Sequence, residues 1–368
     1  MEHPLRVGII GVGFGARVQL PAFLSISGVR VVGVADSGSG RARRVAAGLG
    51  EGVWAWENWK EAIEEAGVDL ISVATPPYVQ AEIVCAAVSA GKHVLCEKPF
   101  GMNGEEAARM WGLAQNARLV GAVDVEFRME PGIAEIRRLV ASGEIGAVRR
   151  VRVTWFTRSG GALSIPWSWR HDAQRGGGVL NAFASHVVDY VEWICGSRIH
   201  RVSARCEVLV KERTDSHGRK RPVTAEDHCE LTCDFVSGAV AEVAVSNCSS
   251  SDAGHRIEVH GDAGRLIFVH EPPFMPDKAR LRIEINSRGS RTVPLEQLPP
   301  VVGQLDTRIL AFRELAERFV RAASGVAVRD LPDFACGVRV QRILDAARES
   351  SRLGKTIPVV EETKAACH

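Results

Sequence analysis

The chain has 368 residues, 46% of them hydrophobic and 24% charged, with a formal net charge of +2 at pH 7. This length favours two domains, and the composition excludes disordered and fibrous classes. The near-neutral charge, with arginines scattered along the chain, gives no reason to expect a nucleic-acid partner. No apolar run reaches the roughly 18 residues of a membrane span, and the first predicted strand leaves no room for a signal peptide. We therefore expect a cytoplasmic protein with no membrane partner.

The sequence contains nine irregularly spaced cysteines, an odd number that favours reduced thiols over a disulfide framework. The one local cluster contains Cys229 and Cys233. On a strand these two side chains and Leu231 would share one face, which favours a buried apolar face over a metal site. We expect no bound metal.

An apolar run over residues 5–10 ends in glycines and then opens a predicted helix. Its glycines match a G-x-G-x-x-G/A dinucleotide fingerprint, in which the backbone turns tightly and approaches a pyrophosphate at a helix N-terminus. Asp36 ends the second predicted strand, twenty residues after Ala16, where a carboxylate can accept the hydroxyls of an adenosine ribose. A glycine turn can be purely structural, but this order of elements favours nucleotide binding. The predicted cofactor contacts are Gly11, Gly13, Phe14, Gly15, Ala16 and Asp36.

Beyond this turn, apolar runs alternate with segments of helical periodicity. Further strands are predicted at 29–35, 68–75, 92–96 and 119–123. Helices are predicted at 16–25, 40–49, 56–66, 79–90 and 104–116. The alternation indicates an α/β Rossmann domain with a doubly wound parallel sheet, which we assign to residues 1–124. Ligands of such sheets bind outside the carboxyl ends of the strands.

Two of these strand ends carry unusual residues. Thr75 and Pro76 end the third strand, and the proline fixes the backbone where the chain should turn over a ligand, although a rigid loop would look the same. The fourth strand leads directly into Glu97, Lys98 and Pro99. A solvated Glu–Lys pair is the plainer interpretation. Alternatively, a partly desolvated lysine ammonium could polarise a substrate hydroxyl or carbonyl.

The second half of the chain has a different pattern. A predicted helix at 132–142 and a strand at 148–156 precede a loop over 166–172 and a helix that begins near Gly178. Period-2 segments follow at 201–210, 227–235, 239–245, 255–260, 264–269 and 279–286, with a solvated hairpin loop at 211–221. Strands in series without helices between them suggest an antiparallel sheet.

We therefore assign residues 125–368 to an α+β domain with a large, open, mainly antiparallel sheet. Two further helices are predicted at 306–323 and about 336–352. The last helix is a candidate for packing back on the first domain.

The glycine turn, the Thr-Pro-Pro turn and the Glu-Lys-Pro motif together resemble the glucose-fructose oxidoreductase and inositol dehydrogenase family, Gfo/Idh/MocA. The resemblance continues through Glu126-Phe127-Arg128, Trp169-Arg170, Gly176-Gly177-Gly178-Val179-Leu180, His186-Val187-Val188-Asp189 and residues 337–346. It therefore covers nearly the whole chain. It implies an NAD(P)-dependent oxidoreductase that transfers a hydride between nicotinamide and a sugar, polyol or related hydroxyl/carbonyl substrate.

The same resemblance assigns roles to single residues. Lys98 and His186 match positions that the family uses at the substrate, so they are the expected catalytic pair, and the Lys98–Pro99 peptide is expected to be cis. Thr75, Pro76, Glu97 and Lys98 join the cofactor contacts. Weaker substrate contacts are expected at Arg128, Trp169, Arg170, Asn181 and Asp189. The family's second domain also implies a homodimer or homotetramer formed through the exposed face of its sheet.

Two positions depart from the family pattern. Ala182 stands where many members carry an Asp one helical turn before the His, and Gln80 replaces a His common after the Thr-Pro-Pro turn. Two other functions therefore stay open beside the favoured one. The first is a glycosidase-like or eliminating enzyme that recycles NAD. The second is a non-catalytic nucleotide-binding regulator, which Ala182 favours and the retained Lys98 and His186 oppose.

NAD is the expected coenzyme, with NADP less favoured. Asp36 would repel a 2′-phosphate held against it. Arg41, Arg43 and Arg44 could instead bind that phosphate, although they more simply line the exposed side of the helix that follows. The sequence leaves the identity of the substrate open.

Overall fold

The computed structural model describes residues 4–158, 161, 164–286, 288–301 and 306–360. Internal contacts divide the chain into two compact units. The first comprises Met1–Pro131 with Glu296–Gln341, and the second comprises Gly132–Leu295 with Arg342–His368. The helix α9 (Phe334–Leu353) contributes residues to both units.

The first unit is built on a six-stranded parallel sheet of order β3-β2-β1-β4-β5-β6. Its strands are β1 (Leu5–Ile10), β2 (Val29–Ala35), β3 (Trp54–Trp56), β4 (Leu70–Val73), β5 (His93–Glu97) and β6 (Gly121–Asp124). Its helices are η1 (Gly15–Gln19), α1 (Leu20–Leu24), α2 (Arg41–Ala47), α3 (Trp59–Glu64), α4 (Pro77–Ser89), α5 (Gly104–Ala117), η2 (Glu126–Met129) and α8 (Arg308–Ala323). The strand order reverses between β1 and β4, which confirms the predicted doubly wound fold.

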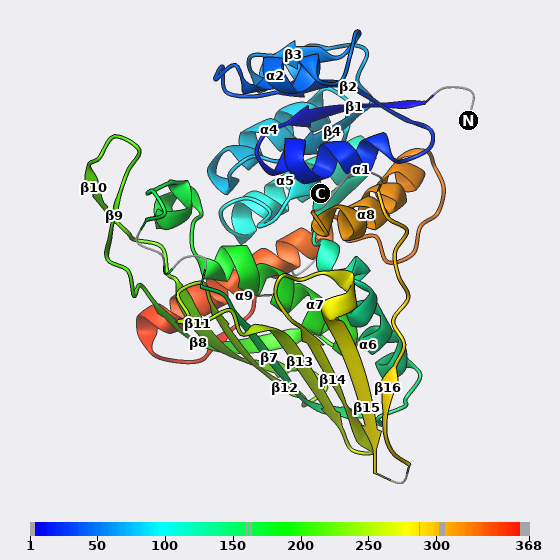
Figure 1. Ribbon diagram of the computed structural model, residues 1–368, viewed down its shortest axis with the longest axis vertical. Coiled ribbons are helices and arrows are strands. Elements are labelled where there is room, and N and C mark those ends of the chain that lie inside the picture. Colours follow the sequence, from blue (N-terminus) through cyan, green and yellow to red (C-terminus); the bar gives the residue numbers. More distant parts are fainter. Residues whose placement is uncertain (1–3, 159–160, 162–163, 287, 302–305, 361–368) are drawn as a thin grey trace, which may run out of the picture. The chain divides into compact units, whose positions relative to one another are not determined.

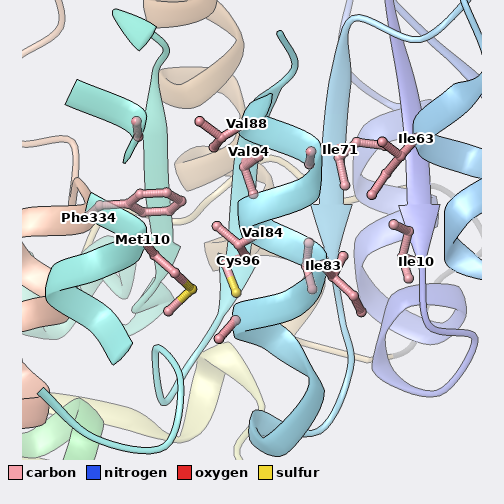
Figure 2. Close-up of a cluster of buried hydrophobic side chains, with 14 of the residues drawn as sticks. Ile10, Ile63, Ile71, Ile83, Val84, Val88, Val94, Cys96, Met110 and Phe334 are labelled. Carbon is pink, nitrogen blue, oxygen red and sulfur yellow. The ribbon is translucent and has the colours of Figure 1, made fainter. Parts of the chain in front are cut away.

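Apolar side chains alternate along these strands and fill both faces of the sheet. One cluster includes Ile10, Val94 and Cys96 together with Phe334 from the start of α9 (Figure 2). The neighbouring residue Ile9 belongs to a second cluster, which contains side chains of α1 and α8. Both faces of the sheet are therefore covered by apolar side chains.

The helix predicted at 56–66 is wrong at its start. Residues Trp54–Trp56 form the edge strand β3, whose Trp56 ring packs over Gly33 so closely that a Cβ on that glycine would lie 2.3 Å from the ring. The helix α3 begins only after Asn58, whose side-chain oxygen caps it by accepting the Lys60 N–H at 2.9 Å. A three-residue edge strand is too short to show a period in the sequence.

The second unit contains a nine-stranded sheet of order β16-β15-β14-β13-β7-β12-β11-β8-β17 and a separate hairpin, β9 with β10. The strands are β7 (Val148–Phe156), β8 (Ile199–Glu207), β9 (Glu212–Thr214), β10 (Lys220–Pro222), β11 (His228–Phe235), β12 (Val240–Ser246), β13 (Gly254–Gly261), β14 (Gly264–His270), β15 (Ala279–Ile285), β16 (Gly289–Val293) and β17 (Ile357–Pro358). The helices are α6 (Pro131–Ala141), η3 (Trp169–His171), η4 (Ala173–Arg175), η5 (Leu180–Ala184), α7 (Ser185–Cys195) and η6 (Pro276–Lys278).

This sheet confirms the predicted large, mainly antiparallel sheet. Strand β7 pairs in parallel with β12, while its other neighbour, β13, is antiparallel. One parallel pair in this sheet agrees with the expectation of a mainly antiparallel sheet. The strands β16 and β17 were not predicted, because one is exposed along most of its length and the other has two residues.

Helices α6 and α7 lie against one face of the nine-stranded sheet (Figure 1). Most side chains that point to this face are apolar and buried; Cys229, Leu231 and Cys233 are among them, as predicted. The buried Tyr190 of α7 places its hydroxyl 2.8 Å from Nε2 of His255 on β13. Trp155 stacks on the same imidazole, with ring centroids 4.8 Å apart.

The opposite face of the same sheet carries charged side chains that pair across strands. Glu242 contacts both Arg150 and Arg152, and Arg201 pairs with Asp234 at 2.9 Å. Among the described residues, no helix is long and apolar enough to cross a membrane. All eight described cysteines are free thiols, and Cys367 lies outside the described residues.

Candidate functional site

The glycine turn after β1 leaves space beside the backbone of its central residue, Gly13. Gly11 has a φ of +108°, and a Cβ on it would lie 2.4 Å from the carbonyl oxygen of Ala74. A Cβ on Gly15 would approach that of Ala74 to 3.0 Å, whereas one on Gly13 would meet nothing within 4 Å. Gly11 and Gly15 are therefore required by packing, and the exposed Gly13 leaves room for a ligand at the backbone. This arrangement fits a pyrophosphate at the turn.

Asp36, at the end of β2, is fixed by the residues that follow it. Its carboxylate accepts hydrogen bonds from the Gly38 N–H at 2.9 Å, the Arg41 N–H at 2.8 Å and the Ser39 hydroxyl. Burial acts to raise the pKa of Asp36, but these hydrogen bonds outweigh it and lower the pKa below its usual value. The carboxylate is therefore ionised and held in one orientation beside the first turn of α2.

The turn after β4 contains an unsatisfied polar atom. The hydroxyl oxygen of Thr75 is buried and has no hydrogen-bond partner among the described residues. Buried hydroxyls in folded proteins normally have a partner. A bound ligand that donates to or accepts from this hydroxyl would satisfy it, which supports the predicted place of Thr75 in a cofactor site.

Gln80, which departs from the family pattern, links three segments of this edge. Its amide nitrogen donates to the carbonyl oxygen of Thr75 at 3.3 Å and to that of Glu97 at 3.1 Å. Its amide oxygen accepts the Gly101 N–H at 2.8 Å. Gln80 is completely buried. It therefore positions the turn after β4 and the loop after β5, a role that the sequence did not reveal.

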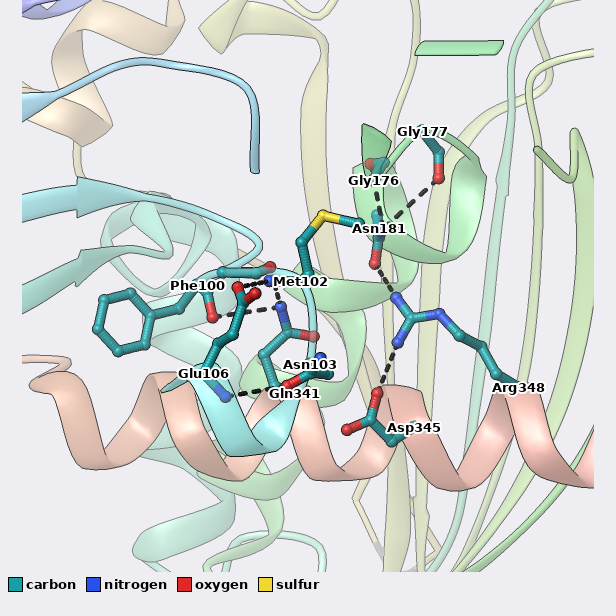
Figure 3. Close-up of polar contacts among 11 residues, drawn as sticks. Phe100, Met102, Asn103, Glu106, Gly176, Gly177, Asn181, Gln341, Asp345 and Arg348 are labelled. Carbon is teal, nitrogen blue, oxygen red and sulfur yellow. Dashed lines mark hydrogen bonds and ion pairs between the residues drawn. The ribbon is translucent and has the colours of Figure 1, made fainter. Parts of the chain in front are cut away.

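The loop after β5 begins at Lys98, and its Lys98–Pro99 peptide is cis, as the resemblance implied. Gln341 of α9 donates to the carbonyl oxygens of Phe100, at 3.2 Å, and of Gly101 (Figure 3). The first turn of α5 also fixes the loop, since Glu106 accepts the Met102 N–H at 3.0 Å. Lys98 is thus half-buried on a loop whose backbone is held from two helices.

Buried polar side chains lie beneath this loop. Gln19 of η1 donates to Oε1 of Glu97 at 3.0 Å and lies 3.5 Å from Oδ2 of Asp124, at the end of β6. Its amide oxygen accepts the hydroxyl of Ser72 at 2.8 Å. Gln19, Ser72 and Asp124 are completely buried, and Glu126 is 5% exposed. Of these residues only Glu97 was predicted from the sequence.

The three carboxyl groups at this edge are unusually basic. Burial raises the pKa of Glu97, although its hydrogen bond with Asp124 and the charge of Lys98 oppose the shift. Burial and the charges of Glu97 and Glu126 raise the pKa of Asp124 well above its usual range. Burial and the charge of Glu97 also raise the pKa of Glu126 to about 7. A carboxyl group with a pKa near 7, as for Glu126, can exchange protons near neutral pH.

In the second unit, three glycines precede the helix that carries His186. A Cβ on Gly177 would lie 2.4 Å from the carbonyl oxygen of Arg170, and one on Gly178 would lie 2.1 Å from the carboxyl group of Glu226. That carboxyl accepts the Leu180 N–H at 3.0 Å. Only glycine allows this approach, which brings the Trp169–Arg170 loop against the start of η5.

Asn181 on η5 is buried and held from two directions. Its amide nitrogen donates to the carbonyl oxygen of Gly176 at 3.1 Å, and its amide oxygen accepts from the guanidinium of Arg348. Asp345, one turn earlier on α9, fixes the same guanidinium at 2.8 Å (Figure 3). The predicted Asn181 therefore has a defined orientation, which depends on Arg348, a residue that the sequence did not point to.

His186 and Asp189 lie three residues apart on α7, each 3% exposed. Trp155 of β7 lies beside this segment, with its ring 6.3 Å from the His186 ring and stacked on Phe183 at 4.4 Å. Ala182 is exposed on η5, one turn before His186. In the preceding loop, the guanidinium of Arg170 lies 4.8 Å from the ring of Trp169.

The predicted site residues thus form two groups. In the first unit, the glycine turn, Asp36, Thr75 and the pair Glu97 and Lys98 follow β1, β2, β4 and β5, so they share the carboxyl edge of one sheet. Arg128 is in the same unit, on η2, with Nη2 3.6 Å from Sγ of Cys336. In the second unit, η5 and α7 carry Asn181, His186 and Asp189, with Trp169 and Arg170 on the preceding loop.

Comparison with known proteins supports the fold of both halves of the chain. A profile described as "Oxidoreductase family, NAD-binding Rossmann fold" matches residues 5–125, and one described as "GFO/IDH/MocA C-terminal domain" matches residues 133–267. Levoglucosan dehydrogenase of Pseudarthrobacter phenanthrenivorans is 28% identical, over 94% of this chain and 96% of its own. Inositol 2-dehydrogenase 1 of Saccharopolyspora erythraea is 30% identical, over 71% and 73%.

Among solved structures, levoglucosan dehydrogenase in complex with NADH and L-sorbose superimposes with a TM-score of 0.85 at 27% identity, over 97% of this chain and 99% of that one. The family resemblance expected from the motifs is therefore confirmed. Both family profiles and the fold lead to one conclusion: the chain belongs to the GFO/IDH/MocA family of oxidoreductases, whose first domain is an NAD-binding Rossmann fold.

Proposed function

We propose that this protein is an NAD-dependent dehydrogenase of a sugar, polyol or related hydroxyl/carbonyl compound, with residues 1–124 binding the coenzyme and residues 125–368 contributing to the substrate site. The observation that carries the proposal is the carboxyl edge of the six-stranded sheet, where the open turn at Gly13, the buried hydroxyl of Thr75 and Lys98 follow strands of one sheet. The relatives named as levoglucosan and inositol dehydrogenases support this substrate class.

The residues present fit a dinucleotide. The turn at Gly11 and Gly13 would hold the pyrophosphate through backbone N–H groups, and Thr75 and Pro76 would border the coenzyme. When bound, the nicotinamide supplies the hydride acceptor or donor. Lys98 Nζ would take the proton from the substrate hydroxyl during oxidation. His186 would hydrogen-bond the same oxygen, with Asp189 orienting its ring, and Arg128, Trp169, Arg170 and Asn181 are proposed as weaker substrate contacts.

NAD is proposed in preference to NADP because Asp36 is an oriented, ionised carboxylate that would repel a 2′-phosphate. Two of the nearby arginines already have partners: Arg43 pairs with Glu57, and Nε of Arg41 donates to Ser39 at 3.0 Å. Titration of both coenzymes tests the preference. Clearly tighter binding of NADP would contradict it.

The test of the function is a screen of sugars and polyols that follows the absorbance of the reduced coenzyme. In Lys98→Met and His186→Ala, turnover should fall by roughly 100-fold or more, the usual scale of acid–base assistance, while the affinity for NAD changes little. Lys60→Met, on the exposed surface of α3, is the matched control and should behave as wild type. Near wild-type turnover in both variants would show that this assignment is wrong, and the catalytic groups would then be sought in the 166–172 loop.

One observation keeps two other candidate functions open beside the dehydrogenase. Ala182 is exposed on η5, so this position supplies no acid one turn before His186. An NAD-recycling glycosidase or eliminating enzyme, or a non-catalytic regulator, would also retain the coenzyme turn. Bound NAD without net reduction during turnover would identify the recycling enzyme, and NAD binding with no turnover of any tested sugar would identify the regulator.

We also propose a cytoplasmic homodimer or homotetramer that associates through the charged face of the nine-stranded sheet. This face has a hollow of about 600 Å³ bordered by β7, β8, β11, β12 and the segment after α9. Thr232→Arg would add a charge inside the hollow. Sedimentation should show an oligomer for the wild-type protein and dissociation for the variant, and a monomeric wild-type protein would exclude the proposal.

A further inference from the structure

Three carboxyl groups meet beneath the loop that carries Lys98. Glu97 and Asp124 are paired residues at the carboxyl ends of the neighbouring strands β5 and β6, and Glu126 begins η2 two residues later. The side-chain contacts of Asp124 with both glutamates favour a proton on Asp124. Oδ1 of the completely buried Asp124 has no donor among the described residues. We name Glu97, Asp124 and Glu126 the carboxyl cluster.

A proton is the simplest occupant of the carboxyl cluster. Two carboxyl groups in hydrogen-bond contact cannot both be ionised at low cost, because their charges repel each other in a poorly solvated site. Within the described part of the chain, no group of His, Cys, Asp and Glu side chains is arranged to hold a metal ion. The amide of Gln19 donates to the cluster but carries no charge.

The charged and titratable groups around the cluster come from three directions. Lys98 acts on Glu97 and Glu126 from the loop after β5. Arg308 of α8 acts on the same two carboxyls, and it also pairs with Asp306. Cys96 lies under the cluster as a completely buried thiol, and the two nearby carboxyls help burial to raise its pKa. Lys98 directly follows Glu97 in the chain, its charge acts on Glu97 and Glu126, and its side chain is half-exposed.

We propose that the carboxyl cluster accepts, through Glu126, the proton that Lys98 removes from the substrate hydroxyl. This inference rests on the proposed dehydrogenase function and deepens it. As the substrate is oxidised, its O–H bond breaks and the proton binds the neutral amine of Lys98. The N–H bond then breaks, an O–H bond forms at the Glu126 carboxylate, and Lys98 returns to its neutral form. The reverse transfers supply the proton during reduction.

This assignment also accounts for the family departure at residue 182. The exposed Ala182 has no proton-accepting group, so η5 does not offer the acid that many members carry there. The first unit instead places three carboxyls at the ends of β5 and β6 and the start of η2, with Glu97 directly preceding Lys98. The proton would therefore leave through the sheet edge and not through η5.

The first test needs neither coenzyme nor substrate. Infrared spectra of the full-length protein at pH 6 should contain the C=O stretch of a protonated, buried carboxyl group. Asp124→Asn and Glu126→Gln should each reduce this band, whereas Glu105→Gln, in the exposed first turn of α5, should leave it unchanged. Spectra in which neither cluster variant changes the band would overturn the proposal.

The second test measures turnover. Glu126→Gln should lower kcat by roughly 100-fold and flatten its pH profile, with the KM for substrate and the affinity for NAD unchanged. Added formate, a small carboxylate, should restore part of the rate, which a purely structural defect would not show. Glu126→Asp keeps a carboxyl group and should retain most of the activity. Unchanged kcat, or a loss in KM alone, would refute the relay.

The two proposals fail in different ways. If the protein does not bind NAD or oxidises no sugar or polyol, the proposed function is wrong, whatever the infrared result. If oxidation depends on Lys98 but not on Glu126, the function stands and the carboxyl cluster is not its proton acceptor.

Discussion

The carboxyl edge of the six-stranded sheet and the charged face of the nine-stranded sheet use the same side chains in opposite ways. At the edge, Asp124 is completely buried and Glu126 is 5% exposed, and both have raised pKa values. On the face, Glu242 pairs with Arg150 and Arg152, whose side chains are 53% and 57% exposed, and its pKa is lowered. Burial without enough countercharge makes a carboxyl basic, whereas an exposed arginine partner makes it more acidic.

The two regions also differ in what their carboxyl groups contribute to stability. Ion pairs exposed to water contribute roughly 0–1 kcal/mol each, because solvent screens them and the side chains lose entropy. A carboxyl buried beside other carboxyls costs stability when it ionises, and such strongly perturbed groups cluster at functional sites. Removing a single charge should therefore change stability more at the buried carboxyl edge than on the charged face.

The largest effect is expected at Glu126. Its pKa is raised from 4.5 to about 7 in the folded protein, so the folded state binds more protons than the unfolded state across that window. This contribution is fully present below pH 4.5 and is lost as the pH rises through 7. The free energy of unfolding should therefore fall by about 2–3 kcal/mol more in the wild-type protein than in Glu126→Gln between pH 5 and 8.

The measured quantity is the difference between the two proteins in denaturant unfolding at each pH. Buried histidines act in the opposite direction, since burial lowers the pKa of His255 to about 3 and stability from this group is lost as the pH falls below its unfolded value. They contribute equally to both proteins. Identical pH dependence in the two would show that Glu126 ionises normally.

A smaller effect is expected at Arg348, whose contact with Asn181 lies in the second unit, away from the carboxyl edge. It tests whether burial by itself determines how much stability is lost when a polar partner is removed. Arg348→Met removes the donor to the amide oxygen of the buried Asn181 and should destabilise the protein by about 1–3 kcal/mol. Arg352→Met, one turn further along α9 and 70% exposed, is the control and should change stability by less than about 0.5 kcal/mol. Equal losses in both variants would contradict a special role of Arg348.

The smallest effect is expected on the charged face. Glu242→Gln removes the partner of two arginines but should cost less than about 1 kcal/mol at low salt, and less still at high salt. Thermal unfolding at both salt concentrations measures this. A loss as large as that at Glu126, insensitive to salt, would mean that this face is buried, for example in an oligomer.

The fold could be predicted from the sequence wherever local pattern decides structure. Buried parallel strands give continuous apolar runs, so β1, β2, β4, β5 and β6 were found, whereas the short edge strand β3 was taken as the start of a helix. The glycine turn and the Glu-Lys-Pro motif were recognisable because their residues are adjacent in the chain.

The supporting residues could not be found in this way, because their partners are far away in sequence. Gln19 is 78 residues from Glu97, Arg348 is 167 residues from Asn181, and Gln341 is 241 residues from Phe100. A lone Gln or Arg on a helix has many possible roles, and only the fold selects one. Gln80 was noticed as a departure from a pattern, but its three contacts depend on the turns that meet around it.

The contact between Tyr190 and His255 has a practical consequence for spectroscopy. The chain contains only two tyrosines, of which Tyr78 is 45% exposed and Tyr190 is completely buried, with burial raising the pKa of its phenol well above the usual range. In an alkaline titration followed by ultraviolet absorbance, the phenol of Tyr190 should therefore ionise only when the packing around α7 opens. The absorbance of a single phenolate thus reports selectively on the unfolding of the second unit, without a label and without interference from the eight tryptophans.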